Sequence, residues 1–292
     1  MSMFIMQLIN GINIGSIYAL IALGYTMVYG IAKLINFAHG DIIMVGAYVA
    51  YVCIIKLQLP IIAAIIISIL ACALLGVIIE KVAYKPLRKA SRITLLITAI
   101  GVSYLLQSSF RLIFSSNPVT FPQLINLPSI KLGAINISGN YYLTFIISVI
   151  IMILLDLFVQ HSQTGRAMRA CSEDEGAARL MGIDVDKTIT IVFAISSALA
   201  AIAGLLYCSS YPIVSPYLGA LPGIKAFIAA VLGGIGNIKG AVLGAFILGL
   251  VEALTKAYIS SQLSDAIVFT ILIVMLVFKP DGILGKNVKE KV

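Results

Sequence analysis

The chain of 292 residues is 61% hydrophobic, contains only 11% charged residues and has a formal net charge of +8. Its charged fraction is about half of that in soluble domains, and a soluble fold of this length has too little interior to bury so much apolar surface. The apolar runs are continuous and close to 20 residues long, which predicts an all-α polytopic transmembrane bundle rather than a barrel of alternating strands.

Nine apolar segments, separated by polar, proline-containing or glycine-containing breaks, predict about eight or nine spans. They cover residues 4–29, 41–56, 60–79, 93–114, 141–159, 187–207, 223–237, 240–258 and 265–279. No break is long enough for a separate soluble domain, so residues 1–292 are expected to form one transmembrane domain. The first segment has no basic stretch before it, and we expect no cleaved signal peptide.

Two of these segments, 41–56 and 223–237, are unusually short. At about 1.5 Å per residue each spans roughly 22 Å, less than the roughly 30 Å of a bilayer core. Short or broken helices at similar places in two halves of a chain are typical of a translocation site in transporters. The alternative is a pair of ordinary tilted helices that use glycine for packing. Polar residues at the breaks are candidates for the lining of a path: Asn36, His39, Asp41 and Asn237.

Glycines recur at a spacing of four residues in two segments. Gly236, Gly240 and Gly244 follow one another from the end of the seventh segment into the eighth, and Gly11 and Gly15 lie in the first. Small residues at this spacing let helices approach closely in lipid. The pattern predicts tight packing, either within the subunit or across an interface with a partner.

Charged and catalytic residues are sparse. Glu252 and Lys256 have the spacing and order of a helical ion pair, and so few acidic residues lie within the apolar segments that a gradient-driven carrier is disfavoured. His39 and Asp41 alone are too few ligands for a metal, so no metal site is predicted. No P-loop, G-x-S-x-G or H-E-x-x-H motif occurs, so neither an enzyme nor a bound nucleotide cofactor is expected. The cysteines are interpreted as packing residues: Cys53, Cys72, Cys171 and Cys208.

Lysine and arginine predict the orientation in the membrane. They are concentrated in three places: in residues 81–92 at Lys81, Lys85, Arg88, Lys89 and Arg92, in the 160–187 loop at Arg166, Arg169, Arg179 and Lys187, and in the tail at Lys279, Lys286, Lys289 and Lys291. The 115–140 loop has only Lys131. With nine crossings, this bias predicts an N-terminus outside and a C-terminus in the cytoplasm, and it accounts for the positive charge without a nucleic-acid partner.

The polar stretch SEDEGAARLMG, residues 172–182, predicts a short helix within the 160–187 loop. Ser172 and Glu175 have the spacing of a capping box, and Gly182 is a suitable residue after the helix end. So short a helix is marginal alone in water and needs a surface to lie against. It is either a cytoplasmic knob that fits a groove on a soluble partner or an interfacial connector between two spans.

Three separated stretches carry a resemblance to a known family. GRAMRACSEDEGAARLMGIDV resembles the cytoplasmic loop of permease subunits in bacterial ATP-binding-cassette importers. LINFAHGDIIMVGAYVA (34–50) and SPYLGALPGIKAFIAAVLGGIGNIKGAVLGAFILGLVEAL (215–254) are similar to the high-affinity branched-chain amino-acid permease family. The resemblance extends over nearly the whole chain, with the motifs in the same order.

The resemblance implies a multi-pass protein of the bacterial plasma (inner) membrane and several partners. These are a second related permease subunit, two ATP-binding subunits that bind the ATP, a periplasmic or lipid-anchored substrate-binding protein, membrane lipid and the amino-acid substrate. It also implies that the loop docks on the ATP-binding subunits, with coupling residues Gly165, Glu173, Ala177, Arg179, Leu180 and Gly182. Leucine, isoleucine and valine are the expected substrates, and urea, short amides or other amino acids remain alternatives.

Overall fold

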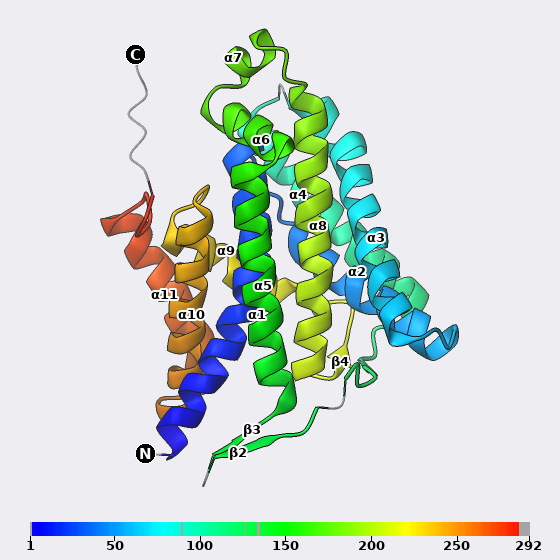
Figure 1. Cartoon of the computed structure of the whole chain (residues 1–292), viewed down its shortest axis with the longest axis vertical. Coiled ribbons are helices and arrows are strands. Elements are labelled where there is room, and N and C mark those ends of the chain that lie inside the picture. The colour runs from blue at the N-terminus through cyan, green and yellow to red at the C-terminus, as the bar shows by residue number, and fades with distance from the viewer. Residues whose placement is uncertain (1, 89, 126, 133–134, 286–292) are drawn as a thin grey trace.

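A computed structural model describes residues 2–88, 90–125, 127–132 and 135–285 as a helical bundle (Figure 1). The α-helices are α1 (Ser2–Ala32), α2 (His39–Tyr51), α3 (Ile61–Ile79), α4 (Arg92–Phe114), α5 (Gly139–His161), α6 (Gln163–Glu173), α7 (Glu175–Leu180), α8 (Val185–Ser210), α9 (Ala220–Gly233), α10 (Ile238–Tyr258) and α11 (Leu263–Phe278). Two π-helical turns, Val52–Lys56 and Glu80–Tyr84, extend α2 and α3, and a 3₁₀ turn follows at Lys85–Leu87.

Two small antiparallel ribbons accompany the helices. β1 (Val119–Thr120) pairs with β4 (Ile213–Val214), and β2 (Ile130–Leu132) pairs with β3 (Ile135–Ile137). They lie in the connections that lead into α5 and α9, so the bundle itself is helical as predicted.

Seven helices within the described residues are long and apolar enough to cross a membrane, and α9 and α11 are shorter apolar helices. The second predicted short segment, α9, has 14 residues. The first is slightly longer than predicted, because its helix begins at His39 rather than at residue 41, and with the π-turn after α2 the span covers the 18 residues His39–Lys56. Each of the nine predicted apolar segments overlaps one of these helices, and the segment 223–237 extends past the end of α9 at Gly233.

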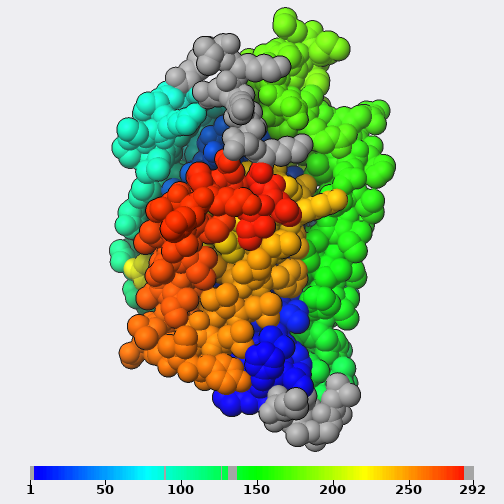
Figure 2. All heavy atoms as spheres, turned by 90° about the vertical axis from the view of Figure 1, so that its left-hand side faces the viewer, coloured from blue at the N-terminus to red at the C-terminus, as the bar shows by residue number. Residues whose placement is uncertain are grey.

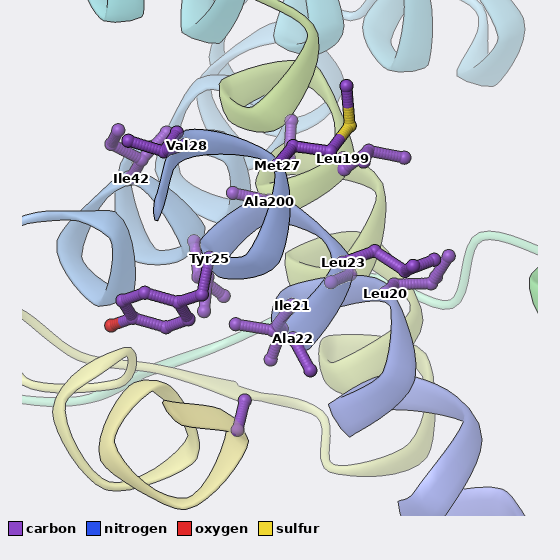
Figure 3. Close-up of a cluster of buried hydrophobic side chains, with 14 of the residues drawn as sticks. Leu20, Ile21, Ala22, Leu23, Tyr25, Met27, Val28, Ile42, Leu199 and Ala200 are labelled. Carbon is purple, nitrogen blue, oxygen red and sulfur yellow. The ribbon is translucent and has the colours of Figure 1, made fainter. Parts of the chain in front are cut away.

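The core is built around α1, because 89% of the most apolar 18-residue stretch of this helix is buried. Figure 3 shows Met27 of α1 beside Leu199 of α8, while Tyr25 points away toward α9. The Tyr25 ring lies 5.7 Å from that of Phe227 on α9. The first predicted span is therefore the hub of the bundle rather than a peripheral anchor.

The predicted glycine contacts lie within the subunit. A Cβ at Gly11 would be 2.9 Å from the Cα of Leu250, and one at Gly249 would be 2.5 Å from the Gly15 nitrogen. At Gly244 a Cβ would be 2.8 Å from the Gly233 nitrogen. Glycine thus brings the backbones of α1, α9 and α10 together, and the spacing seen in the sequence serves internal packing.

The two ends of the bundle differ. The first turns of α1 and the β2–β3 ribbon lie at one end, and α7 lies at the opposite end (Figure 1). Lys89, Lys286, Lys289 and Lys291, which support the predicted orientation, lie outside the described residues.

Candidate functional site

The N-terminal ends of α2 and α9 meet at glycines. A Cβ at Gly40 would lie 2.7 Å from the carbonyl oxygen of Gly219, and one at Gly223 would lie 2.8 Å from the Gly40 Cα. Only residues without a side chain allow this approach. The two predicted short segments, one from each half of the chain, thus bring two helix N-termini together, where partial positive charge is concentrated.

A cavity of about 360 Å³ lies beside this junction, between α2, α4 and α9. Its polar wall includes Asp41, Ser103, Tyr104 and Gln107. Asp41 is buried, and the Gln107 Nε2 donates a hydrogen bond to its Oδ1 at 2.8 Å. A buried carboxylate needs such donors or a cation, so the cavity is suited to a ligand that carries a positive group.

A polar stripe runs along α4 on the same side. Ser103, Gln107 and Arg111 are spaced four residues apart, and Arg111 Nη1 donates to the Tyr217 hydroxyl at 3.1 Å. Tyr104 is 65% exposed, and only 6% of the most apolar 18-residue stretch of α4 is buried. Because lipid does not solvate polar groups, such a stripe requires an aqueous path or another protein surface.

The other predicted path residues lie elsewhere. Asn36 is buried and its Oδ1 accepts from the Tyr84 hydroxyl at 2.8 Å. His39 is buried, with its ring 4.7 Å from that of Tyr25. Asn237 caps α10, where its Oδ1 accepts from the Gly240 nitrogen at 3.2 Å. Of the four candidates, Asp41 is the one that lines the cavity.

The polar 160–187 loop contains two helices rather than one. Ser162 caps α6 by accepting from the Gly165 nitrogen at 2.8 Å. The Arg169 guanidinium donates to the carbonyls of Val159 and Gln160, at 2.6 and 2.8 Å, near the end of α5. A Cβ at Gly165 would lie 2.5 Å from the Phe158 carbonyl oxygen. These contacts fold α6 back against α5, and the predicted coupling residue Gly165 makes the approach possible.

The predicted capping box at Ser172 and Glu175 is wrong. Ser172 lies inside α6, and Asp174 caps α7 by accepting from the Ala177 nitrogen at 3.0 Å. The physical reason is that α6 buries Met168 against the bundle and so continues past Ser172 to Glu173, which is exposed. Asp174 is then the first residue outside the helix with a side-chain acceptor.

The tip of α7 is apolar and exposed. Leu180 and Met181 are 90% and 82% exposed, while Ala178 packs inward. The predicted helix end is confirmed: Gly182 has φ +82°, its nitrogen donates to the Arg179 carbonyl, and the Ile183 nitrogen donates to the Ala178 carbonyl, both at 3.0 Å. These two bonds form a Schellman motif. The motif defines the end of α7 and leaves an exposed apolar tip at the end of the molecule.

Ion pairs join α7 to two membrane helices. Arg179 lies 3.6 Å from Asp186 at the start of α8, and Asp186 pairs with Arg88 at 2.8 Å and with Lys85 at 3.1 Å. Arg88 also pairs with Glu80, which is fully buried at the end of α3. Sequence reasoning missed this network because its members are up to about 100 residues apart. It also missed Gln107, although the four-residue polar spacing on α4 was a usable signal.

Together, the apolar helices, the two helix N-termini that meet beside the cavity and the protruding loop define a multi-pass membrane transport component. Residues 7–276 match the family model described as the permease component of branched-chain amino acid transport systems. The chain belongs to this family, which confirms the resemblance predicted from the three sequence stretches.

Curated relatives cover almost the full length. The chain is 43% identical to the high-affinity branched-chain amino acid transport system permease protein LivH of Salmonella typhimurium, over 99% of this chain and 98% of the relative. It is 42% identical to BraD of Pseudomonas aeruginosa, with the same coverage. A probable branched-chain amino acid permease of Methanocaldococcus jannaschii is 29% identical over 98% and 94% of the two chains. These relatives are transport permeases rather than enzymes.

Proposed function

We propose that this chain forms one half of the translocation path of an ATP-driven importer for leucine, isoleucine and valine. The observation that carries the proposal is the exposed apolar tip of α7, formed by Leu180 and Met181. The relatives of the chain are components of branched-chain amino acid transport systems. Leu180 and Met181 fit a groove on a soluble ATP-binding subunit, because exposed apolar side chains of this size favour burial at an interface.

The cavity at the α2–α9 junction is the proposed path. The Asp41 carboxylate would accept hydrogen bonds from the substrate ammonium group. The partial positive charge at the N-terminal ends of α2 and α9 would attract the substrate carboxylate. Phe37, Ile100 and Ile224 provide an apolar wall for a branched aliphatic side chain. Urea and short amides are uncharged and would leave Asp41 without a counter-charge, so the cavity favours amino acids over these alternatives.

We propose the remaining partners from the family to which the chain belongs. A second related permease would cover the polar stripe of α4, two ATP-binding subunits would bind the α7 tips and hydrolyse the ATP, and a periplasmic or lipid-anchored binding protein would deliver substrate to the opposite end. The N-terminus then lies outside and the end of α11 lies on the cytoplasmic side of a bacterial plasma membrane. Movement of α7 would reach α8 and α3 through Arg179, Asp186 and Arg88.

The coupling role is tested in the complete importer reconstituted in liposomes, by comparing Leu180→Asp with Leu180→Met. A charge at the tip opposes burial whereas methionine preserves the apolar surface, so Leu180→Asp is expected to reduce leucine uptake by about tenfold or more, equivalent to about 1.4 kcal/mol of docking energy. Leu180→Met should transport normally, and both variants should insert equally into the membrane. Equal uptake by Leu180→Asp and the unmodified importer would mean that α7 is only a connector.

The path role is tested with Asp41→Asn and the matched control Asp156→Asn. Each aspartate accepts a hydrogen bond at 2.8 Å from a glutamine side chain, but Asp156 lies on α5 away from the cavity. Asp41→Asn should lower the maximal rate of leucine uptake by about tenfold, since one charge-assisted contact is lost. Asp156→Asn should not. An Asp41→Asn importer with a normal rate would remove Asp41 from the path.

A further inference from the structure

A second cavity, of about 230 Å³, lies on the opposite face of the first turns of α9. Leu221, Pro222 and Lys225 line this cavity, whereas Gly223 and Ile224 line the cavity beside Asp41. The start of α9 is therefore a shared wall between two cavities. The second cavity is bounded by α1, α8, α10 and α11, and Figure 2 shows the side of the molecule where α11 lies over α10.

Four charges of alternating sign line the second cavity. Lys256 Nζ lies 2.6 Å from Glu252 Oε1, which confirms the ion pair predicted from the sequence. Lys225 Nζ lies 2.7 Å from the same oxygen and 2.6 Å from Asp265 Oδ1. The Tyr18 hydroxyl donates to Glu252 Oε2 at 2.8 Å. The row Lys256, Glu252, Lys225, Asp265 thus links α9, α10 and α11 and has no net charge.

The inner and outer members of this row differ in exposure. Lys225 and Glu252 are 5% and 1% exposed, so their charged groups are paired with each other inside the protein. The side chains of Lys256 and Asp265 are 39% and 43% exposed. One cation and one anion at the ends of the row therefore remain accessible to a ligand that carries both charges.

A purely structural ion network explains these contacts less well. Buried ion pairs are costly to desolvate, and apolar residues of similar volume often stabilise a protein equally well or better. A structural network also gains from close packing, but here the four charges surround a cavity large enough for a small ligand. The network therefore fits recognition of a charged group better than it fits simple helix attachment.

The rest of the wall suits an aliphatic amino acid. Ile14, Ile17 and Leu221 provide apolar surface, and the Tyr207 and Tyr211 side chains face the same space. The Tyr211 hydroxyl can donate a hydrogen bond to a carboxylate.

We propose that this cavity is a second site for the transported amino acid, occupied before the cavity beside Asp41. The ammonium group pairs with Asp265, the carboxylate pairs with Lys256 and accepts from the Tyr211 hydroxyl, and the branched side chain lies against Ile14 and Leu221. The end of α10 and the start of α11, which contribute Lys256 and Asp265 to the cavity lining, lie at the end of the bundle opposite α7 (Figure 1), where substrate would enter. The inference rests on the proposed import of branched-chain amino acids.

The test uses photo-leucine, a diazirine analogue of leucine with free ammonium and carboxylate groups, and the complete importer in liposomes. Uptake of photo-leucine is measured first. The importer is then irradiated with photo-leucine at saturation, and adducts are mapped by mass spectrometry. Adducts are expected on peptides containing Ile14, Ile17 or Leu221, and excess leucine should remove them. Neither 3-methylbutylamine nor 4-methylpentanoate should compete, since each carries only one of the two charges.

Variants separate recognition from stability. Asp265→Asn keeps the Lys225–Glu252 pair and should reduce labelling in the cavity by about tenfold, as expected for the loss of one charge-assisted contact. Asp156→Asn, on α5, should label normally. A Phe278→Ala importer provides a second unaffected reference, because this side chain is exposed at the far end of α11.

The outcomes distinguish the two proposals. Normal photo-leucine uptake with no adduct in the cavity would overturn the second site and leave the proposed function intact. So would unchanged labelling in Asp265→Asn, or competition by the compound that lacks the ammonium group. Failure of the unmodified importer to take up photo-leucine or leucine would overturn the proposed function, and the second site with it.

Discussion

The most apolar 18-residue stretches of α1 and α4 have equal mean hydropathy, yet the two helices occupy opposite environments. Of these stretches, 89% is buried in α1 and only 6% is buried in α4. Hydropathy therefore identifies both as membrane helices but does not indicate which one forms the core. Within a bilayer, lipid and protein interior are similarly apolar, so burial depends on shape rather than on hydrophobicity.

Small residues account for the difference. Gly11 and Gly15 on α1 approach Gly249 on α10 at backbone distance, so the two helices interlock over several turns. On α4, large side chains such as Leu105 and Leu112 point outward. The aromatic stack of Tyr48 with Phe114, at 4.5 Å, and the Asp41–Gln107 hydrogen bond connect α4 to α2. Thus α1 is held by its backbone and α4 by a few side chains.

The largest effect should come from a side chain added where α1 and α10 interlock. Gly249→Val should destabilise the fold by more than about 3 kcal/mol, because the added methyl groups meet the backbone of α1 and no rotamer avoids it. The measurement is the yield and thermal stability of monodisperse protein in detergent.

Gly101→Val on α4 is the matched control, since no atom of the described residues outside its own helix lies within 4 Å of a Cβ there. Its stability should be nearly unchanged. If the two valine variants behave alike, the glycine contacts do not explain the difference between α1 and α4.

An intermediate effect is expected for Phe114→Ala, which removes the aromatic stack between α4 and α2. The loss of burial and stacking should cost about 2 kcal/mol and increase hydrogen exchange along α4 more than along α1. Phe278→Ala on α11 serves as the reference, because that ring is 82% exposed. Uniform destabilisation of α1 and α4 would show that α4 is not separately attached.

The smallest effects are expected at two exposed glycines of the 160–187 loop, and with opposite sign. Gly182→Ala places a side chain at φ +82° and should destabilise the end of α7 by about 1 kcal/mol. Gly176→Ala lies in the first turn of α7, where its Cβ would be 3.2 Å from Asp174 Oδ1; with a small movement of that side chain it should stabilise α7 by about 0.5 kcal/mol, because alanine favours the helix. Hydrogen exchange of the α7 amides measures both, and changes of the same sign would contradict the assigned helix end.

Much of the fold could be predicted from the sequence because the relevant interactions are local. Apolar run length identified all nine segments, the glycine after Met181 marked the end of α7, and the spacing of Glu252 and Lys256 predicted their ion pair. The start of α7 was predicted wrongly, because the burial of α6 against the bundle, rather than the capping pattern, decides where that helix ends.

The candidate site was less accessible to sequence reasoning. Asp41 was selected as a polar residue beside a helix break, but its partner Gln107 is 66 residues away. Asn237 resembled Asp41 in the sequence and instead caps α10. Lys225 lies on α9 and Glu252 lies on the following helix, α10, so no local sequence pattern connects the two.

The sequence by itself determined that the chain is a membrane protein, where most of its long apolar helices begin and end to within a few residues, and to which family it belongs. These depend on apolar run length, helix-end chemistry and motif order, which neighbouring residues encode. The tertiary structure alone decided that α1 is the core, that two helix N-termini meet at a cavity, and that four charges from three helices form one row. Such arrangements depend on which helices pack together, and in lipid that choice follows from the close fit of distant surfaces rather than from hydropathy.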